Sequence, residues 1–210
     1  CDDGYLLLVG ELEILPSGYT KHTATGYDDV YVDTTDIFYA NTSGHWVYPE
    51  INVGRLIGHS IDNLRRPVQL SLALHENLSN HNFDRSNALT LAGKGGGVSE
   101  FESNVDDVTK LLQKNYTNVA KYKVREVEKS GQNMLTVFKN NVGNKDVIFY
   151  RDHCNEFEWS YVIHTSNYYP INFGVTKPFV FACCCSSGRY HRSHSGNYPL
   201  WGIAECFLGD

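Results

Sequence analysis

Short apolar runs alternate along the chain with segments in which apolar residues recur at helical spacing. A continuous apolar run is typical of a strand buried on both faces, and strands that alternate with helices predict a parallel sheet. The expected strands are Tyr5–Val9, Ile51–Leu56, Ala88–Ala92, Val119–Val127, Val147–Tyr150 and Phe179–Cys184. The expected helices begin at Ser60, after a cap at Ser103 or Asn104, at Asn133 and at Trp201. The pattern therefore predicts a three-layer α/β domain whose mainly parallel sheet is flanked by helices.

Two connecting segments lack these periodicities. Residues 19–50 are polar, aromatic and rich in turn residues, which predicts an irregular segment with at most a short hairpin. The segment Gly93–Gly97 is glycine-rich but lacks the Gly-Lys-Ser/Thr order of a phosphate-binding loop. We interpret it as a flexible link.

Reactive or charged side chains follow three of the expected strands. Glu11, His153 and Cys185 all lie at or just beyond a strand's carboxyl end. Ligands of parallel sheets bind beyond these ends, so His153 and Cys185 could form a base and nucleophile pair. From the pattern alone, a buried cysteine cluster beside a surface histidine is the alternative.

Composition narrows the class of protein. With 210 residues and 41% hydrophobic content, the chain fits one globular domain over residues 1–210. A net charge of −6 without a basic stripe argues against a nucleic-acid partner. No apolar run approaches the roughly 20 residues of a membrane span. Because the sequence starts at Cys1 with a strand soon after, we expect either a piece of a longer chain with other domains or a processed product.

Six cysteines are present and none has CxxC spacing. Their clustering does not predict a disulfide framework, and a thiol-redox protein is the least favoured reading. A zinc site built from His153, Cys154 and the triplet Cys183–Cys185 is an open alternative, although the spacing matches no common motif. Three sequons, at Asn41, Asn77 and Asn115, permit glycosylation if the protein is secreted. The high Tyr, Asn and Ser content and the single Met favour an extracellular protein.

Several blocks of sequence carry a resemblance to a known family. They are Tyr5–Glu11 with Pro16, Asp36–Ala40 with Gly44, Tyr48–Leu56, Ile148–His153 with Trp159, Pro178–Gly188 and Ile203–Leu208. In this order, and over nearly the whole chain, they resemble the gingipain-like cysteine peptidases of clan CD. The resemblance implies a caspase-like fold.

The resemblance also implies roles for individual residues. His153 matches the catalytic histidine, and Cys185 matches the nucleophile because it precedes Gly188 by three positions. Glu50 matches a glutamate that hydrogen-bonds the histidine, although alone it reads as a solvated carboxylate. The backbone N–H groups of residues Cys154 and Cys185 are implied to form the oxyanion hole. Trp159 is implied to border the substrate pocket, and Asp62 is either an acidic pocket residue or a helix-dipole partner.

The chain departs from the family pattern around both reactive residues. Asp152-His153-Cys154 replaces Gly-His-Gly, so a Cβ at residue 154 could crowd the oxyanion donor and Asp152 places a charge beside the imidazole. The Ala-Cys adjacency of the family selects Cys183 as nucleophile, whereas the spacing to glycine selects Cys185. We favour Cys185, and expect the two cysteines before it to be packed in the core.

The sequence thus predicts a secreted or cell-surface cysteine endopeptidase acting on protein or peptide substrates. We expect such a peptidase to require no cofactor. Structural calcium is possible at Asp28–Asp29 or Asp106–Asp107. The alternative is a catalytically inactive pseudopeptidase module with a structural or binding role in a larger extracellular protein. Asp152 and Cys154 favour that alternative.

Overall fold

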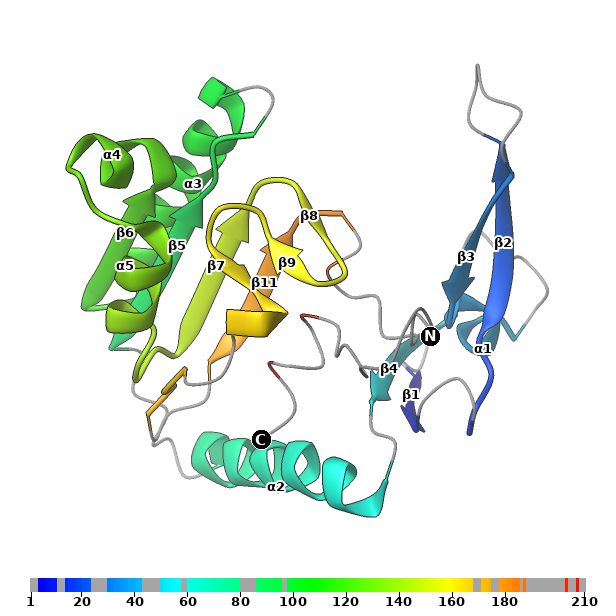
Figure 1. The fold of residues 1–210 in the computed structure, drawn as a ribbon. Helices are drawn as coiled ribbons and strands as arrows, with labels where there is room; N and C mark the ends of the chain where they lie inside the picture. Colours follow the sequence, from blue (N-terminus) through cyan, green and yellow to red (C-terminus); the bar gives the residue numbers. More distant parts are fainter. Residues whose placement is uncertain are drawn as a thin grey trace. The chain divides into compact units, whose positions relative to one another are not determined.

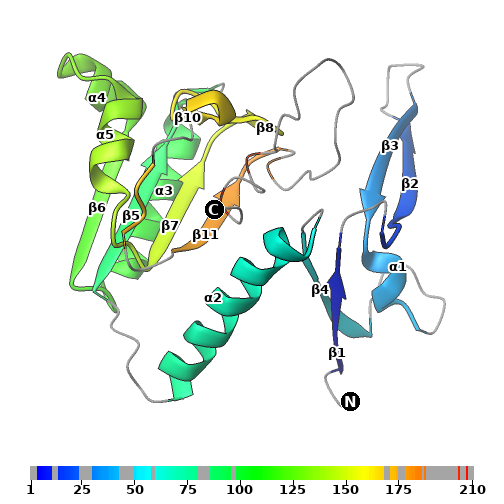
Figure 2. The same ribbon diagram turned by 60° about the horizontal axis from the view of Figure 1, so that its bottom comes forward.

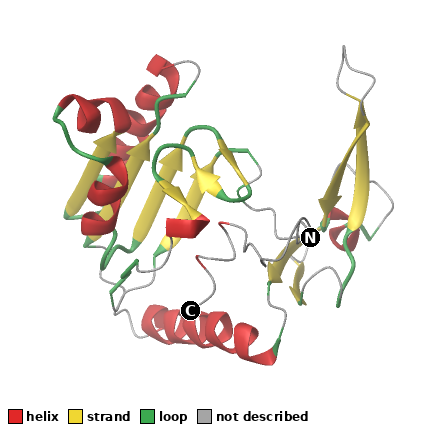
Figure 3. Ribbon diagram, in the orientation of Figure 1, coloured by secondary structure: helices red, strands yellow, loops and turns green. Residues whose placement is uncertain are grey.

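The computed structural model describes residues 4–10, 14–23, 30–42, 50–57, 60–79, 86–95, 98–167, 171–174, 178–185, 187, 203 and 207. Contacts divide the chain into two compact units, residues 1–69 with 209, and residues 70–208 with 210. Figure 3 distinguishes the helices and strands of both units by colour. Among the described residues, no helix is long and apolar enough to cross a membrane.

The first unit contains two pairs of strands and the start of a long helix. Strand β1 (Gly4–Val9) pairs in parallel with β4 (Ile51–Leu56), and both strands were expected. The burial on both faces expected for β1 was wrong, because Tyr5, Leu7 and Val9 are exposed on one face. The hairpin allowed within residues 19–50 is β2 (Gly18–Thr23) with β3 (Val30–Thr35), followed by α1 (Ile37–Ala40). Helix α2 (Ile61–Ser79) begins after Ser60 as expected, and its later residues belong to the second unit.

A buried arginine ties the first unit together. The Arg55 guanidinium donates to Asp36 Oδ2 at 2.7 Å and to the carbonyl oxygens of Gly10 at 2.7 Å and Leu15 at 3.0 Å. The planar donor fork of arginine suits such a multiple contact, and its side chain is only 4% exposed. Strand β4 is thereby linked to the segment after β1 and to the start of α1.

The second unit is built around a parallel sheet in the order β11-β7-β5-β6. Its strands are β5 (Asn87–Ala92), β6 (Asn118–Lys123), β7 (Val147–Arg151) and β11 (Phe179–Cys183). Helix α3 (Val98–Leu112) covers one face, while α4 (Val124–Lys129) and α5 (Met134–Asn141) cover the other (Figures 1 and 2). The predicted α/β arrangement with a mainly parallel sheet between helices is confirmed.

Alternating side chains of these strands supply the two halves of the core. On the α4 and α5 face the buried strand residues are Leu89, Leu91, Ile148 and Tyr150, packed with Val124, Val127, Val137 and Phe138. On the α3 face Ala92 and Phe149 pack against Val105. This period of two is what a sheet buried on both faces requires, because successive side chains point to opposite sides.

Two predicted boundaries were wrong. The single strand expected over Val119–Val127 ends at Lys123, and α4 follows, because Val124 and Val127 lie three positions apart and both turn to the core. Helix α3 begins at Val98 rather than after Ser103 or Asn104. Phe101 and Val105 lie four positions apart on its buried side, so the helical spacing of apolar residues already begins before Ser103.

The short helix expected at Asn133 is confirmed as α5. Asn133 is its N-cap, and its Oδ1 accepts a hydrogen bond from the Thr136 N–H at 3.1 Å. Three short strands follow β7, namely β8 (Cys154–Asn155), β9 (Glu158–Trp159) and β10 (Ile163–His164), with a 3-10 turn at Thr165–Asn167. Of the final helix expected from Trp201, only Ile203 and Phe207 fall within the described residues.

Candidate active site

The register of the parallel strands brings three loops to one edge of the sheet. Cys183 of β11 pairs with Arg151 of β7, which pairs with Ala92 of β5, so these strands end in one row. We call the residues that come directly after these three strand ends, 93–95, 152–154 and 184–185, the carboxyl edge. The Arg151 guanidinium also donates to the carbonyl oxygen of Cys183 at 2.9 Å. His153 and Cys185 therefore both lie two positions beyond paired residues of neighbouring strands.

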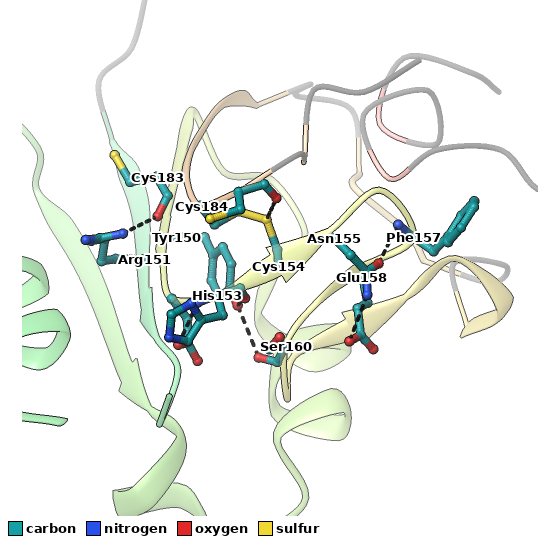
Figure 4. Close-up of a disulfide and its surroundings, with 12 residues drawn as sticks. Tyr150, Arg151, His153, Cys154, Asn155, Phe157, Glu158, Ser160, Cys183 and Cys184 are labelled. Carbon is teal, nitrogen blue, oxygen red and sulfur yellow. Dashed lines mark hydrogen bonds between the residues drawn. A yellow bond between two sulfur atoms is a disulfide. The ribbon is translucent and has the colours of Figure 1, made fainter. Parts of the chain in front are cut away.

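A disulfide joins Cys154 to Cys184 across this edge (Figure 4). The two Cα atoms lie 5.5 Å apart, an ordinary separation for a disulfide. The sulfur of Cys154 also contacts the carbonyl oxygen of Cys185 at 2.6 Å. The residue after His153 is thus bonded to the residue before Cys185. This corrects the expectation that Cys184 is a free core cysteine, and it removes the Cys154 thiolate that the zinc alternative needs.

The three adjacent cysteines have three different environments. Cys183 is a free thiol that packs partly buried against the Ala92, Val105 and Phe149 cluster. Cys184 lies on the opposite face and forms the disulfide, as the alternation of a strand requires. Cys185 follows the end of β11 in a turn, and its thiol is free and exposed. In Figure 4 the sulfur of Cys183 points away from the disulfide.

His153 has a fixed backbone and an exposed side chain. Its carbonyl oxygen accepts hydrogen bonds from the Tyr150 hydroxyl at 2.9 Å and from the Ser160 N–H at 3.3 Å. The imidazole lies edge-on to the Phe101 ring of α3, with ring centroids 5.4 Å apart. An accessible imidazole on an anchored backbone suits a general base, which must meet a substrate while holding its own position.

Tyr150, near the end of β7, anchors the loop that carries His153. It is fully buried, stacks on Trp159 at 4.6 Å between ring centroids, and donates to the carbonyl oxygens of His153 and Ser160. Burial first, and then the negative charge of Asp152, raise the pKa of Tyr150 well above its ordinary value. The hydroxyl therefore remains a donor at every pH at which the protein is handled.

Replacing Tyr150 by phenylalanine is expected to lower the free energy of unfolding by about 1–2 kcal/mol, because two buried carbonyl contacts lose their donor. Urea denaturation measures the loss. Unfolded tyrosine ionises near pH 10, so the deficit should be full below about pH 10 and shrink above it. Tyr122→Phe is the matched control, since Tyr122 donates to Asn141 Oδ1 at 2.9 Å instead. Because Tyr150 anchors the loop of His153, Tyr150→Phe should also change the rate at which Cys185 is alkylated. An equal rate in Tyr150→Phe and Tyr122→Phe would contradict a link between Tyr150 and the site.

The glycine loop after β5 is not a flexible link in its described part. The Gly93 N–H donates to the Arg151 carbonyl oxygen at 3.1 Å, and the Gly95 N–H donates to Asp152 Oδ1 at 3.1 Å. Lys94 pairs with Glu128 at 2.5 Å. For residues 93–95 the prediction of flexibility was wrong, because their partners come from segments distant in sequence. Asp152 is 1% exposed and faces backbone N–H groups.

The other predicted site residues lie elsewhere in the described structure. Trp159, expected at the substrate pocket, is 1% exposed and stacks between Tyr150 and Phe207 in the core. Glu50 belongs to the first unit, where its Oε2 accepts from the Thr42 N–H at 2.8 Å. Asp62 is exposed in the first turn of α2, 3.4 Å from Arg65. The roles assigned to Glu50 and Asp62 stay predictions.

Metal ligands do not gather in the part of the chain that the structure describes, where no group of three His, Cys, Asp or Glu side chains could hold an ion. Asp106, one calcium candidate, is paired with Lys121 at 2.5 Å and Lys123 at 2.8 Å. These two ammonium groups lower the pKa of the Asp106 carboxyl. The candidate pair Asp28–Asp29 lies outside the described residues.

Comparison with known proteins identifies the fold and the family of this chain. A solved protease structure matches 98% of this chain with a TM-score of 0.73 at 17% sequence identity, which shows a shared fold. The matched region is 42% of that protease chain. A search of curated proteins gave no match. The model of peptidase family C25, the gingipain family, matches residues 2–201. The chain therefore belongs to peptidase family C25.

Proposed function

We propose that this chain is the peptidase domain of a cysteine endopeptidase that acts through Cys185 and His153. The observation that carries the proposal is the covalent link between Cys154 and Cys184. It holds the neighbours of His153 and Cys185 together while it leaves the Cys185 thiol free and exposed. Membership in peptidase family C25 supports the same chemistry.

In this mechanism the Cys185 thiolate attacks the carbonyl carbon of the scissile bond and forms a C–S bond. The carbonyl oxygen becomes an oxyanion, for which the N–H groups of Cys154 and Cys185 are the proposed donors. When the intermediate collapses, the C–N bond breaks and protonated His153 gives its proton to the leaving amine. Water then attacks the thioester, His153 takes its proton, and the thiol is regenerated as the acid is released.

The backbone geometry of β8 supports a donor role for Cys154. The Ser160 N–H donates to the His153 carbonyl oxygen, and Cys154 is the next residue, paired with Trp159. Hydrogen-bonded and non-bonded pairs alternate along antiparallel strands, which directs the Cys154 N–H away from β9. The disulfide draws the Cys154 side chain toward Cys184. The Cβ of residue 154 is therefore compatible with the proposed role of its N–H group as an oxyanion donor, although the family has glycine at this position.

A secreted or cell-surface location belongs to the same proposal. The Cys154–Cys184 disulfide supports it, because such bonds persist in oxidising compartments. Membership in the family is the ground for proposing protein or peptide substrates. Further domains of a longer chain are proposed because this chain matches only 42% of the solved protease chain. No cofactor is proposed for catalysis, and a structural calcium ion remains compatible with the family.

A peptide-library digest by the full-length protein tests the proposal. We expect cleavage at a restricted set of sites, loss of cleavage after treatment with iodoacetamide, and a label on Cys185 in the mass spectrum. Cys183, which packs against the α3 side of the core, is the internal control and should label more slowly. An unlabelled Cys185 together with an intact library would support the inactive pseudopeptidase module instead.

A further inference from the structure

We infer that Asp152 is a positioning residue whose carboxylate clamps the Gly93–Gly95 loop against His153 and thereby fixes the imidazole at the carboxyl edge. This inference rests on the proposed function, in which His153 is the base. It assigns a use to an aspartate that sequence comparison presents only as a departure from glycine.

The carboxylate of Asp152 makes the contacts of a clamp. It is 1% exposed, and its Oδ1 accepts from the His153 N–H at 2.6 Å and from the Gly95 N–H at 3.1 Å. Oδ2 lies 3.3 Å from the same Gly95 nitrogen. A buried carboxylate is stable only when hydrogen-bonded, and its described donors here are backbone N–H groups of two different loops. Asp152 therefore links the end of β7 directly to the loop after β5.

The loop fits this carboxylate only because Gly93 and Gly95 have no side chains. A Cβ on Gly93 would lie 1.5 Å from Asp152 Oδ2, and a Cβ on Gly95 would lie 2.4 Å from Oδ1. The same Cβ on Gly95 would lie 2.5 Å from Cδ2 of the His153 imidazole. The backbone of Gly95 is therefore in direct reach of both the clamp and the ring.

The imidazole is thus bordered by the glycine loop and by Phe101. Gly95 approaches the Cδ2 edge of the ring, and the Phe101 ring stands edge-on at 5.4 Å between centroids. If the charge of the Asp152 carboxylate is removed, its hydrogen bonds to the Gly95 and His153 N–H groups weaken, and the loop that borders the ring is held less firmly. A displacement of about 1 Å at a reacting group can cost about 100-fold in rate.

The test compares Asp152→Asn, which keeps the shape of the side chain, with Asp146→Asn. Asp146 is the matched control: it precedes the same strand and accepts from the Asn87 N–H at 2.7 Å, but at the opposite edge of the sheet. Hydrogen exchange of the Gly95 and His153 amides reports the clamp. The NMR resonance of His153 Hδ2 reports the position of the imidazole, whose Cδ2 edge adjoins Gly95 and whose centroid lies 5.4 Å from that of the Phe101 ring.

Asparagine keeps one acceptor oxygen, but it removes the negative charge that strengthens both bonds and places an NH2 group where Oδ2 lies 3.3 Å from the Gly95 nitrogen. In Asp152→Asn we therefore expect both amides to exchange about 10-fold faster or more. The Hδ2 resonance should move toward that of free histidine. Peptide cleavage should show kcat about 10- to 100-fold lower with KM within about 2-fold, because positioning acts on the chemical step. Asp146→Asn should leave all three unchanged.

A second pair of variants guards against general loss of structure. Gly93→Ala should displace His153 Hδ2 in the native background, because its Cβ collides with the Asp152 carboxylate. In an Asp152→Gly background the collision partner is gone, so adding Gly93→Ala should have little further effect. Additive effects of the two substitutions would overturn the clamp.

The outcomes separate the two hypotheses. If the wild type cleaves no peptide but Asp152→Asn displaces Hδ2 and frees the amides, the proposed function fails and the positioning of His153 stands. If Hδ2 and the amides are unchanged, or if they change while kcat does not, the inference about Asp152 is overturned. In that last case Asp152 is merely structural, and peptidase activity itself is unaffected.

Discussion

Cys185→Ala should abolish peptide cleavage, with kcat/KM falling by about 10⁴- to 10⁶-fold. Alanine removes the atom that forms the acyl-enzyme, and no general base can compensate for a missing nucleophile. The variant should keep its stability, because Cys185 is exposed in a turn after β11 and is not part of the disulfide. Initial rates on a fluorogenic peptide chosen from the library digest provide the measurement.

Cys183→Ala is the matched control for this experiment. Both residues are free cysteines of the same triplet, but Cys183 packs against the α3 side of the core. Its loss should change kcat/KM by less than about 3-fold and cost about 1 kcal/mol in unfolding free energy. The reverse result, in which Cys183→Ala is inactive and Cys185→Ala is active, would move the nucleophile to the position selected by the Ala-Cys adjacency. Full activity in both variants would refute a cysteine mechanism.

Removing the disulfide with Cys154→Ser and Cys184→Ser together should lower the free energy of unfolding by about 3–4 kcal/mol. The bond closes a loop between residues separated by 30 positions, and a cross-link of this length restricts the unfolded chain by about that amount. Urea denaturation followed by tryptophan fluorescence measures the change. Iodoacetamide labelling of Cys185 should also lose its selectivity over Cys183, because the turn that presents Cys185 is no longer held beside the His153 loop.

The control is the wild type under graded reduction. A reductant concentration that keeps Cys185 free but leaves Cys154–Cys184 intact, as read by mass spectrometry, should give full activity. Stronger reduction should reproduce the serine variant in both stability and labelling. An unfolding midpoint that is the same with and without the bond would show that the sheet register alone holds these loops.

The sequence determined the elements that carry the candidate site. The apolar runs at β5 and β7 predicted parallel strands that are buried on both faces. The similar run at β11 predicted a strand, but Phe179 and Phe181 on one of its faces are exposed. Parity along β11 likewise predicted that Cys183 and Cys184 face opposite sides. The local pattern was less reliable at the start of α3 and at the end of β6. There the helix is indicated by a single pair of apolar residues, Phe101 with Val105 or Val124 with Val127.

Only the tertiary structure decided which residues of the site touch. The Cys154–Cys184 bond joins loops of β7 and β11, and the Asp152 clamp joins loops of β7 and β5. Both contacts depend on the strand order β11-β7-β5-β6, which periodicity does not encode. A glycine-rich loop and a cysteine triplet have many meanings in isolation. They acquire one when a shared register places them within three residues of the same row of a sheet.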